Sequence, residues 1–93
     1  MVVSDHSIRR RFNDLILVAI TSKRIDNLIE TEYPIEEDTK AFKQSGLVKT
    51  SIVRCEYIMT VPEEIIVRKS GNLPKDKMDE IDNILKISLG LDY

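Results

Sequence analysis

Residues 51–61 read SIVRCEYIMTV, and apolar and polar side chains alternate along this stretch with the two-residue period of a β-strand. One face of that strand carries only apolar or amphipathic side chains, those of Val53, Cys55, Tyr57, Met59 and Val61. The other face, with two isoleucines, carries a cation, a carboxylate and a hydroxyl, which belong to Arg54, Glu56 and Thr60. The pattern predicts a central strand with one face in a core, and its polar face either meets water or lines a groove.

Two further stretches have the character of strands. Residues 14–22 read DLILVAITS, an apolar run too short for a typical helix and rich in β-branched residues, which predicts a strand buried on both faces. Thr21 and Ser22 stand at its exit, where hydroxyls become reachable from solvent. Residues 28–35 alternate again, and Pro34 places this strand near a sheet edge because proline cannot donate to the ladder. Shorter strand segments are expected at residues 1–3 and 65–69.

Two helical segments follow from capping signals and spacing. Asp38 is a candidate N-cap for a helical turn that Gly46 closes. A helix of roughly four turns is predicted between Pro74 and Gly90. Its core stripe has three- and four-residue spacing and consists of Met78, Ile81, Ile84, Leu85 and Leu89. Ile87 lies off this stripe and indicates a second apolar surface for a partner or a dimer mate.

Composition limits the class of protein. The chain has 93 residues, 42% hydrophobic and 32% charged, which indicates one soluble domain over residues 1–93. The single cysteine, Cys55, excludes an internal disulfide and is typical of a reducing compartment. No stretch has the length of a secretory signal or a membrane span, so we expect a cytoplasmic protein that does not bind membranes. With a net charge of −2, contact with nucleic acid requires a local basic patch.

The spacing of the polar and charged residues matches no known catalytic or metal-binding motif. His6 is the one histidine, and without a second ligand it predicts no metal site. The three glycines are scattered, so there is no phosphate-binding loop. We therefore expect no metal and no cofactor. The order of elements predicts a mostly β fold, a small curled antiparallel sheet or partial barrel closed by the C-terminal helix.

Several segments together resemble the MazF/PemK toxins, in the right order and at the right spacings between about residues 2 and 91. They are AITS at 19–22, GLVKTSIVR at 46–54, GNLP at 71–74 and LGL at 89–91. The resemblance implies a compact SH3-like β-barrel with a C-terminal helix, usually a homodimer. It implies a toxin of a type II toxin–antitoxin system that cuts single-stranded RNA without metal. A cognate antitoxin would occupy the RNA groove, and the antitoxin complex would bring possible contact with DNA.

The resemblance also assigns candidate site residues. In this family the ribose 2′-hydroxyl is the attacking group, so the protein must supply donors for the phosphate charge and a group that moves protons. Thr21 corresponds to the catalytic hydroxyl that would hydrogen-bond the scissile phosphate, and Ser22 lies beside it. Glu56 matches an acidic position in the groove that would contact a base edge. Lys49 and Ser51 match positions just ahead of the central strand, where a structural role is at least as well supported.

Two departures from the family pattern concern this site. Tyr57 and Met59 stand where relatives often have a glutamine and an arginine, which changes base recognition or empties that part of the groove. The family's catalytic arginine precedes the strand that begins here at Met1, so the first strand and loop of the family are expected to be missing by N-terminal truncation. The open sheet edge would then need pairing or cover. The candidates to replace the missing charge are Arg9, Arg10 and Arg11, with Arg11 as a candidate RNA contact.

Three hypotheses for function follow. The chain is a shortened form of an active toxin endoribonuclease, or it is an inactive binding module that captures antitoxin or RNA, or it is a purely structural dimer with the same fold. All three remain open at the level of sequence. If the Thr21 side chain were buried in the interior, with no concave surface near it, the resemblance to a ribonuclease family would not indicate the function of this chain.

Overall fold

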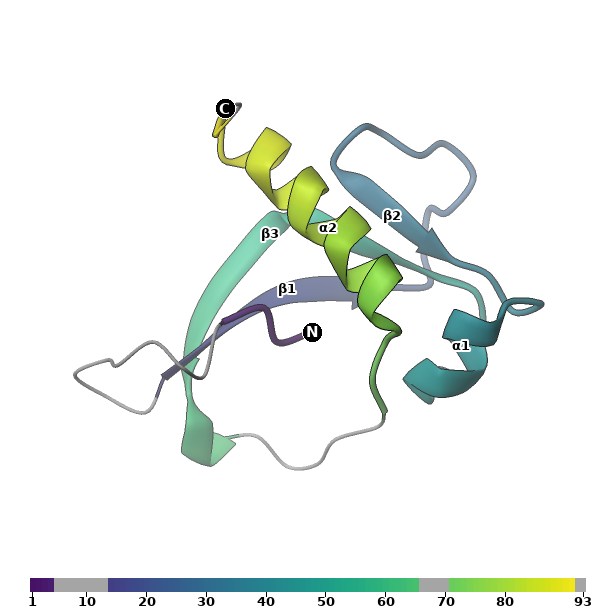
Figure 1. Cartoon of the computed structure of the whole chain (residues 1–93), viewed down its shortest axis with the longest axis horizontal. Coiled ribbons are helices and arrows are strands. Elements are labelled where there is room, and N and C mark those ends of the chain that lie inside the picture. Colours follow the sequence, from purple (N-terminus) through teal and green to yellow (C-terminus); the bar gives the residue numbers. More distant parts are fainter. Residues whose placement is uncertain (5–13, 66–70, 92–93) are drawn as a thin grey trace.

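The computed structural model describes residues 1–4, 14–65 and 71–91, and its centre is a three-stranded antiparallel sheet (Figure 1). The strands are β1 (Asp14–Thr21), β2 (Glu32–Ile35) and β3 (Ser51–Pro62), in the spatial order β1-β3-β2. Between β2 and β3 lies the short helix α1 (Lys40–Ser45), and a 3₁₀ turn (Glu63–Ile65) follows β3. The C-terminal helix α2 (Lys75–Ser88) lies across the sheet. The sheet is open rather than closed into a barrel, and the predicted mostly β fold with a C-terminal helix is confirmed.

The central strand is the one that the sequence predicts, but only its first half keeps the predicted pattern of burial. Val53 and Cys55 are fully buried, whereas Tyr57 is 55% exposed and Met59 is 47% exposed. The cause is an irregularity in the pairing with β1. Val18 of β1 pairs with Ile58 of β3, whereas the next residue, Ala19, pairs with Arg54. Three residues of β3 between those partners have no counterpart on β1, so the faces of the strand exchange beyond them. The prediction of one continuous apolar face was therefore wrong.

Strand β1 has the predicted position but not the predicted burial. Val18 is buried, whereas Ile20 is 36% exposed and the rest of the strand is half-buried. Helix α2 contacts mainly β3 and β2, so Ile20, which lies on the core face of β1 with Val18, is only partly covered. The predicted strand fragment at residues 1–3 pairs with β1, because the Val3 amide donates to the Ile16 carbonyl and the Val18 amide donates to the Met1 carbonyl, each over 2.8 Å.

The segment between β1 and α1 differs from the prediction in two places. Strand β2 begins only at Glu32, because the chain before it forms a turn in which the Glu32 amide donates to the Ile29 carbonyl. Its edge position is confirmed. Thr39, not Asp38, caps α1, because the Thr39 hydroxyl accepts the Phe42 amide over 3.2 Å.

The ends of the two helices agree with the sequence signals. Gly46 closes α1 with φ 76°, and Gly90 follows α2 with φ 71°, both in the left-handed region that favours glycine. Pro74 is the N-cap residue directly before α2, one position earlier than the first-turn position that the sequence indicated. Leu89, however, is 58% exposed and is not part of the core stripe, because it lies beyond the last residue of α2. Ile87 is exposed, in agreement with its place off the stripe.

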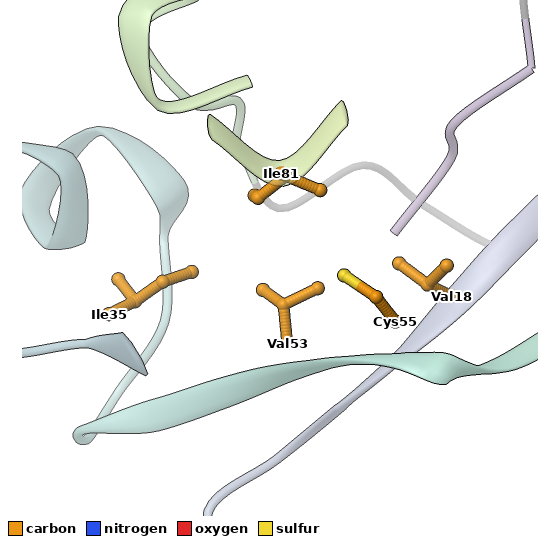
Figure 2. Packing of buried hydrophobic residues seen from close by; sticks show 5 residues of the cluster. All are labelled: Val18, Ile35, Val53, Cys55 and Ile81. Atoms are coloured by element: carbon orange, nitrogen blue, oxygen red, sulfur yellow. The ribbon is translucent and has the colours of Figure 1, made fainter. Parts of the chain in front are cut away.

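The core is a compact cluster between α2 and the sheet (Figure 2). Ile81 is the residue of α2 at its centre, and it is fully buried. The sheet and its edge contribute Val18, Ile35, Val53 and Cys55. Burial raises the pKa of the Cys55 thiol to about 11, with further contributions from the negative charges of Glu56 and Asp82. The thiol therefore stays protonated and serves as a core residue, as predicted.

Two sequence predictions fall outside the described residues. The first is the polar segment with His6, Arg9, Arg10 and Arg11, which lies in residues 5–13. The second is the short strand at residues 65–69, of which only Ile65 is described, and it ends the 3₁₀ turn. In the part of the chain that the structure describes, no helix is long and apolar enough to cross a membrane.

Candidate functional site

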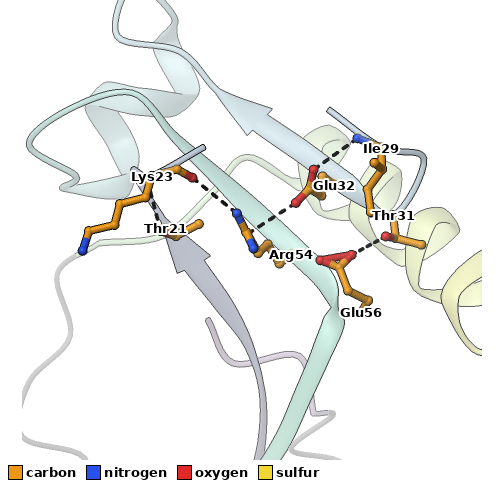
Figure 3. Close-up of polar contacts among 7 residues, drawn as sticks. All are labelled: Thr21, Lys23, Ile29, Thr31, Glu32, Arg54 and Glu56. Carbon is orange, nitrogen blue, oxygen red and sulfur yellow. Dashed lines mark hydrogen bonds and ion pairs between the residues drawn. The ribbon is translucent and has the colours of Figure 1, made fainter. Parts of the chain in front are cut away.

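Thr21 is the last residue of β1 and is half-buried at the exit of the strand (Figure 3). The Lys23 amide donates to Thr21 Oγ1 over 3.1 Å, which forms a local turn directly after the strand. Because this bond uses the oxygen as an acceptor, the hydroxyl proton remains available for donation. Ser22 lies in the same turn and is also half-buried. Thr21 is thus not enclosed in the interior.

The register of the sheet brings charged groups to the side on which Thr21 lies. Arg54 pairs with Ala19 of β1 and with Glu32 of β2, and Ala19 and Thr21 are two residues apart on one strand face. The core residues Val18 and Val53 belong to the opposite face. A polar surface of Thr21, Glu32 and Arg54 therefore crosses all three strands on the side away from α2.

Arg54 connects this surface to the turn that contains Thr21. Its Nη2 donates to the Lys23 carbonyl over 3.3 Å, and its Nε lies 3.3 Å from Glu32 Oε2. The Nε contact is an ion pair rather than a hydrogen bond, because its geometry leaves the Nε proton without a directed acceptor. Glu32 also accepts the Ile29 amide over 3.1 Å. The side chains of Arg54 and Glu32 are only 21% and 7% exposed, so the two charges neutralise each other away from most solvent.

Glu56 lies in the irregular part of β3, which contacts from two other segments hold in place. The Cys55 amide donates to the Thr31 carbonyl, and the Ser88 hydroxyl of α2 donates to the Cys55 carbonyl, each over 2.9 Å. The Thr31 hydroxyl donates to the exposed Glu56 carboxylate (Figure 3). The Arg54 guanidinium lies 6.0 Å from the centre of the Tyr57 ring, at the limit of a cation–π contact. This arrangement fixes Glu56 next to the Arg54 ion pair.

A groove of about 380 Å³ opens between the turn after β1 and strand β3. Its lining consists of Arg24, Asp26, Asn27, Ile29, Glu32 and Arg54. Arg24 has φ 56°, which makes it the non-glycine residue with positive φ in the described chain. The lining of the groove begins at Arg24, three residues after Thr21 in the sequence, and Thr21 itself is not part of it.

A second hollow, of about 730 Å³, lies on the core side of the sheet between β2, α1 and the start of α2. It is lined by charges of both signs, including Lys40, Asp76 and Lys77, and by Tyr33. The Tyr33 hydroxyl donates to Glu80, and burial together with this carboxylate raises the pKa of the phenol. The hollow is separated from Thr21 by the sheet. No cluster of three or more metal-binding side chains occurs among the described residues.

We predict that Arg54→Ala lowers the free energy of unfolding by about 2 kcal/mol, because it leaves the Glu32 carboxylate buried without its cation. The matched control is the double variant Arg54→Met with Glu32→Gln, which removes both charges and is expected to recover at least half of that loss. Urea unfolding followed by circular dichroism measures both values. Equal losses in the single and the double variant would contradict a coupled pair.

Comparison with known proteins identifies the family. A family model described as PemK-like, MazF-like toxin of type II toxin–antitoxin system matches residues 1–89. The chain belongs to this family.

Solved structures with the same fold include relatives from mycobacteria. The Mycobacterium tuberculosis toxin MazF-mt6 superimposes with a TM-score of 0.79 at 19% identity, over 100% of this chain and 86% of that one. An endoribonuclease in complex with its cognate antitoxin, from a mycobacterial species, superimposes with a TM-score of 0.78 at 22% identity, over 100% of this chain and 81% of that one. At these identities the likeness shows that this chain has the MazF toxin fold.

The site residues that the sequence indicated are only partly together in this MazF-family chain. Thr21 and Ser22 share the turn after β1, and Glu56 lies across the polar surface on β3. Arg11 lies outside the described residues. Sequence reasoning missed Arg24 and the partnership of Glu32 with Arg54. The available signal was the pair of consecutive cations that directly follows the two hydroxyl residues.

Proposed function

We propose that this chain is the toxin component of a type II toxin–antitoxin system and that it cleaves single-stranded RNA by attack of a ribose 2′-hydroxyl. The observation that carries the proposal is the Thr21 hydroxyl, which stands at the exit of β1 and keeps its proton available for donation, in a turn that Arg54 of the groove lining hydrogen-bonds. The membership in the PemK-like, MazF-like toxin family supports the same conclusion.

In this reaction the 2′-oxygen forms a bond to the adjacent phosphorus, and the bond from phosphorus to the 5′-oxygen breaks. The products are a 2′,3′-cyclic phosphate and a 5′-hydroxyl, so the proton lost from the 2′-oxygen is balanced by one gained at the 5′-oxygen. Thr21 would donate a hydrogen bond to a non-bridging phosphate oxygen as negative charge develops there. Ser22 lies next to it as a second hydroxyl. Glu56 would accept a hydrogen bond from an amino group on a base edge, since an unpaired base can present that edge to the protein.

The same surface suits the partners expected of a toxin. We propose that a cognate antitoxin competes with RNA for the face of Thr21, Arg54 and Glu56, and that contact with DNA arises through the antitoxin complex. The solved relative in complex with its cognate antitoxin supports this assignment. The exposed side chains of Tyr57, Ile58 and Met59 support a homodimer, because apolar area of this kind favours a contact between copies. A cytoplasmic location fits these partners.

One observation favours a second function, that of an inactive module which binds RNA or antitoxin without cleavage. Arg54, the cation that hydrogen-bonds the Thr21 turn, is already neutralised by Glu32. Loss of a single charge-stabilising donor from a phosphate site costs on the order of 100- to 1000-fold in rate. A chain with this surface would then retain binding and lose turnover.

The test is incubation of the purified chain with single-stranded RNA in buffer containing EDTA. We expect cleavage products with 2′,3′-cyclic phosphate and 5′-hydroxyl ends, identified by mass spectrometry. The matched control is the same oligonucleotide with a 2′-deoxyribose at the cleaved position, which should stay intact because the attacking group is absent. Binding of the RNA without any cleavage would favour the inactive module, and cleavage of the deoxy substrate would contradict the 2′-hydroxyl mechanism.

A further inference from the structure

We propose that Arg24 is a phosphate-binding residue of this protein and that it supplies an accessible positive charge three residues after Thr21. This inference deepens the proposed function and rests on it. It starts from the backbone, since Arg24 has φ 56°, in the left-handed region that residues with a Cβ atom rarely adopt. Such conformations persist where the surroundings determine them, and they cluster at ligand-binding sites.

The surroundings of Arg24 do determine its backbone. Lys23, the residue before it, is held at both ends, because its amide donates to Thr21 Oγ1 over 3.1 Å and its carbonyl accepts Arg54 Nη2 over 3.3 Å. Arg54 is in turn fixed by its ion pair with Glu32. The peptide that enters Arg24 is therefore tied to the Thr21 hydroxyl on one side and to β3 on the other. This arrangement fixes the position of Arg24, which is one of the residues that line the 380 Å³ groove.

The two cations that line the groove, Arg24 and Arg54, differ in whether a carboxylate compensates their charge. Arg54 is compensated by a carboxylate whose side chain is 7% exposed. Arg24 has no carboxylate oxygen within 4.0 Å among the residues that the structure describes, and it is exposed to solvent. Asp26 is the remaining negative group of the lining and opposes an incoming phosphate. A guanidinium with no carboxylate partner in the described part of the chain, three residues after a donor hydroxyl, suits the two-oxygen recognition of a phosphate in the RNA backbone.

The experiment measures binding of the intact chain to a fluorescein-labelled, random-sequence 2′-O-methyl RNA of twelve nucleotides, which cannot be cleaved by 2′-attack. The test variant is Arg24→Gly, because glycine accepts the left-handed backbone and removes only the side chain. We expect the dissociation constant to rise about tenfold. The slope of log K against log salt should fall in magnitude by about 0.7, the value for one phosphate contact on a single strand. Asp26→Asn should tighten binding, because it removes the opposing charge.

The matched control is Lys86→Gln, which removes one positive charge from the exposed face of α2, away from the groove. It should change neither the affinity nor the salt slope by more than a small fraction of the Arg24 effect. Arg24→Lys keeps the charge and should recover the salt slope but not all of the affinity, because it lacks the planar fork. If the wild-type chain binds the RNA and Arg24→Gly changes neither the affinity nor the salt slope, the role of Arg24 is overturned but the proposed function is not. Absence of RNA binding by the wild-type chain overturns this role together with the proposed function.

Discussion

Replacement of Thr21 by alanine is expected to lower the rate of RNA cleavage by 100- to 1000-fold while the protein stays folded. The reason is that the hydroxyl would donate to a phosphate oxygen whose charge grows in the transition state, and a donor of that kind contributes a factor of this size. Thr21 is half-buried at a strand end, and its oxygen accepts only the Lys23 amide within the turn, so its loss removes little packing. Single-turnover cleavage of a labelled RNA at saturating protein measures the effect on the chemical step.

Thr21→Ser is the matched control, because it keeps the hydroxyl and deletes a methyl group. It should retain a rate within about tenfold of the wild type, whereas Thr21→Val keeps the shape and should lose as much as alanine does. Ser22→Ala tests the neighbouring hydroxyl and should have the smaller effect, since the Lys23 amide orients Thr21 rather than Ser22. Cleavage by Thr21→Ala at the wild-type rate would show that the reaction does not depend on this donor.

Much of the fold follows from local patterns in the sequence. The alternation over residues 51–61 predicted the central strand, and the three- and four-residue spacing predicted α2 with Ile81 in its core stripe. Glycine at the end of each helix was equally informative, because the left-handed conformation there is set by the residue itself. Such signals act over one or two turns or a few strand positions, where the side-chain period decides which face is buried.

The burial of Tyr57 and Met59 could not be predicted in the same way. The exchange of faces in β3 depends on contacts far along the chain, from the Thr31 carbonyl to the Cys55 amide and from the Ser88 hydroxyl to the Cys55 carbonyl. These partners lie 24 and 33 residues from Cys55. A period of two read along one strand carries no information about such partners, so the sequence predicted one continuous face.

The candidate site also combines residues that local sequence patterns predict with residues whose position depends on distant contacts. Thr21 was accessible to sequence reasoning because a hydroxyl at the end of an apolar run must lie where the chain leaves the core. The pairing of Arg54 with Glu32 required the register of β2 on β3, which no local pattern gives. The left-handed backbone of Arg24 arises from the hydrogen bonds on both ends of the preceding residue. The sequence therefore predicts the part of the site at the end of β1, but not the parts that depend on strand pairing or on the conformation of the turn.

We expect Ile81→Ala to lower the free energy of unfolding by about 3–4 kcal/mol, the largest stability effect of a single change in this chain. Ile81 is fully buried and is the residue of α2 that enters the central cluster with Val53 and Cys55. Its removal takes away apolar contact and leaves a cavity that α2 cannot close, since the helix is packed against both β3 and β2. A domain of this length has a total stability of only roughly 5–14 kcal/mol, so the loss is a large share.

Ile87→Ala makes the same chemical change on the same helix and serves as the control. Ile87 is 51% exposed, and alanine has the higher helix propensity, so its effect should stay within about 0.5 kcal/mol of zero. Urea unfolding should show a lower midpoint for Ile81→Ala with an unchanged slope. Because Val53 and Cys55 flank Arg54 on β3, a loosened core should also weaken the hydrogen bond from Arg54 to the Lys23 carbonyl in the Thr21 turn. The rate of RNA cleavage by Ile81→Ala should then fall at temperatures well below its unfolding midpoint. Activity that persists up to that midpoint would show that the geometry of the site does not depend on this core packing.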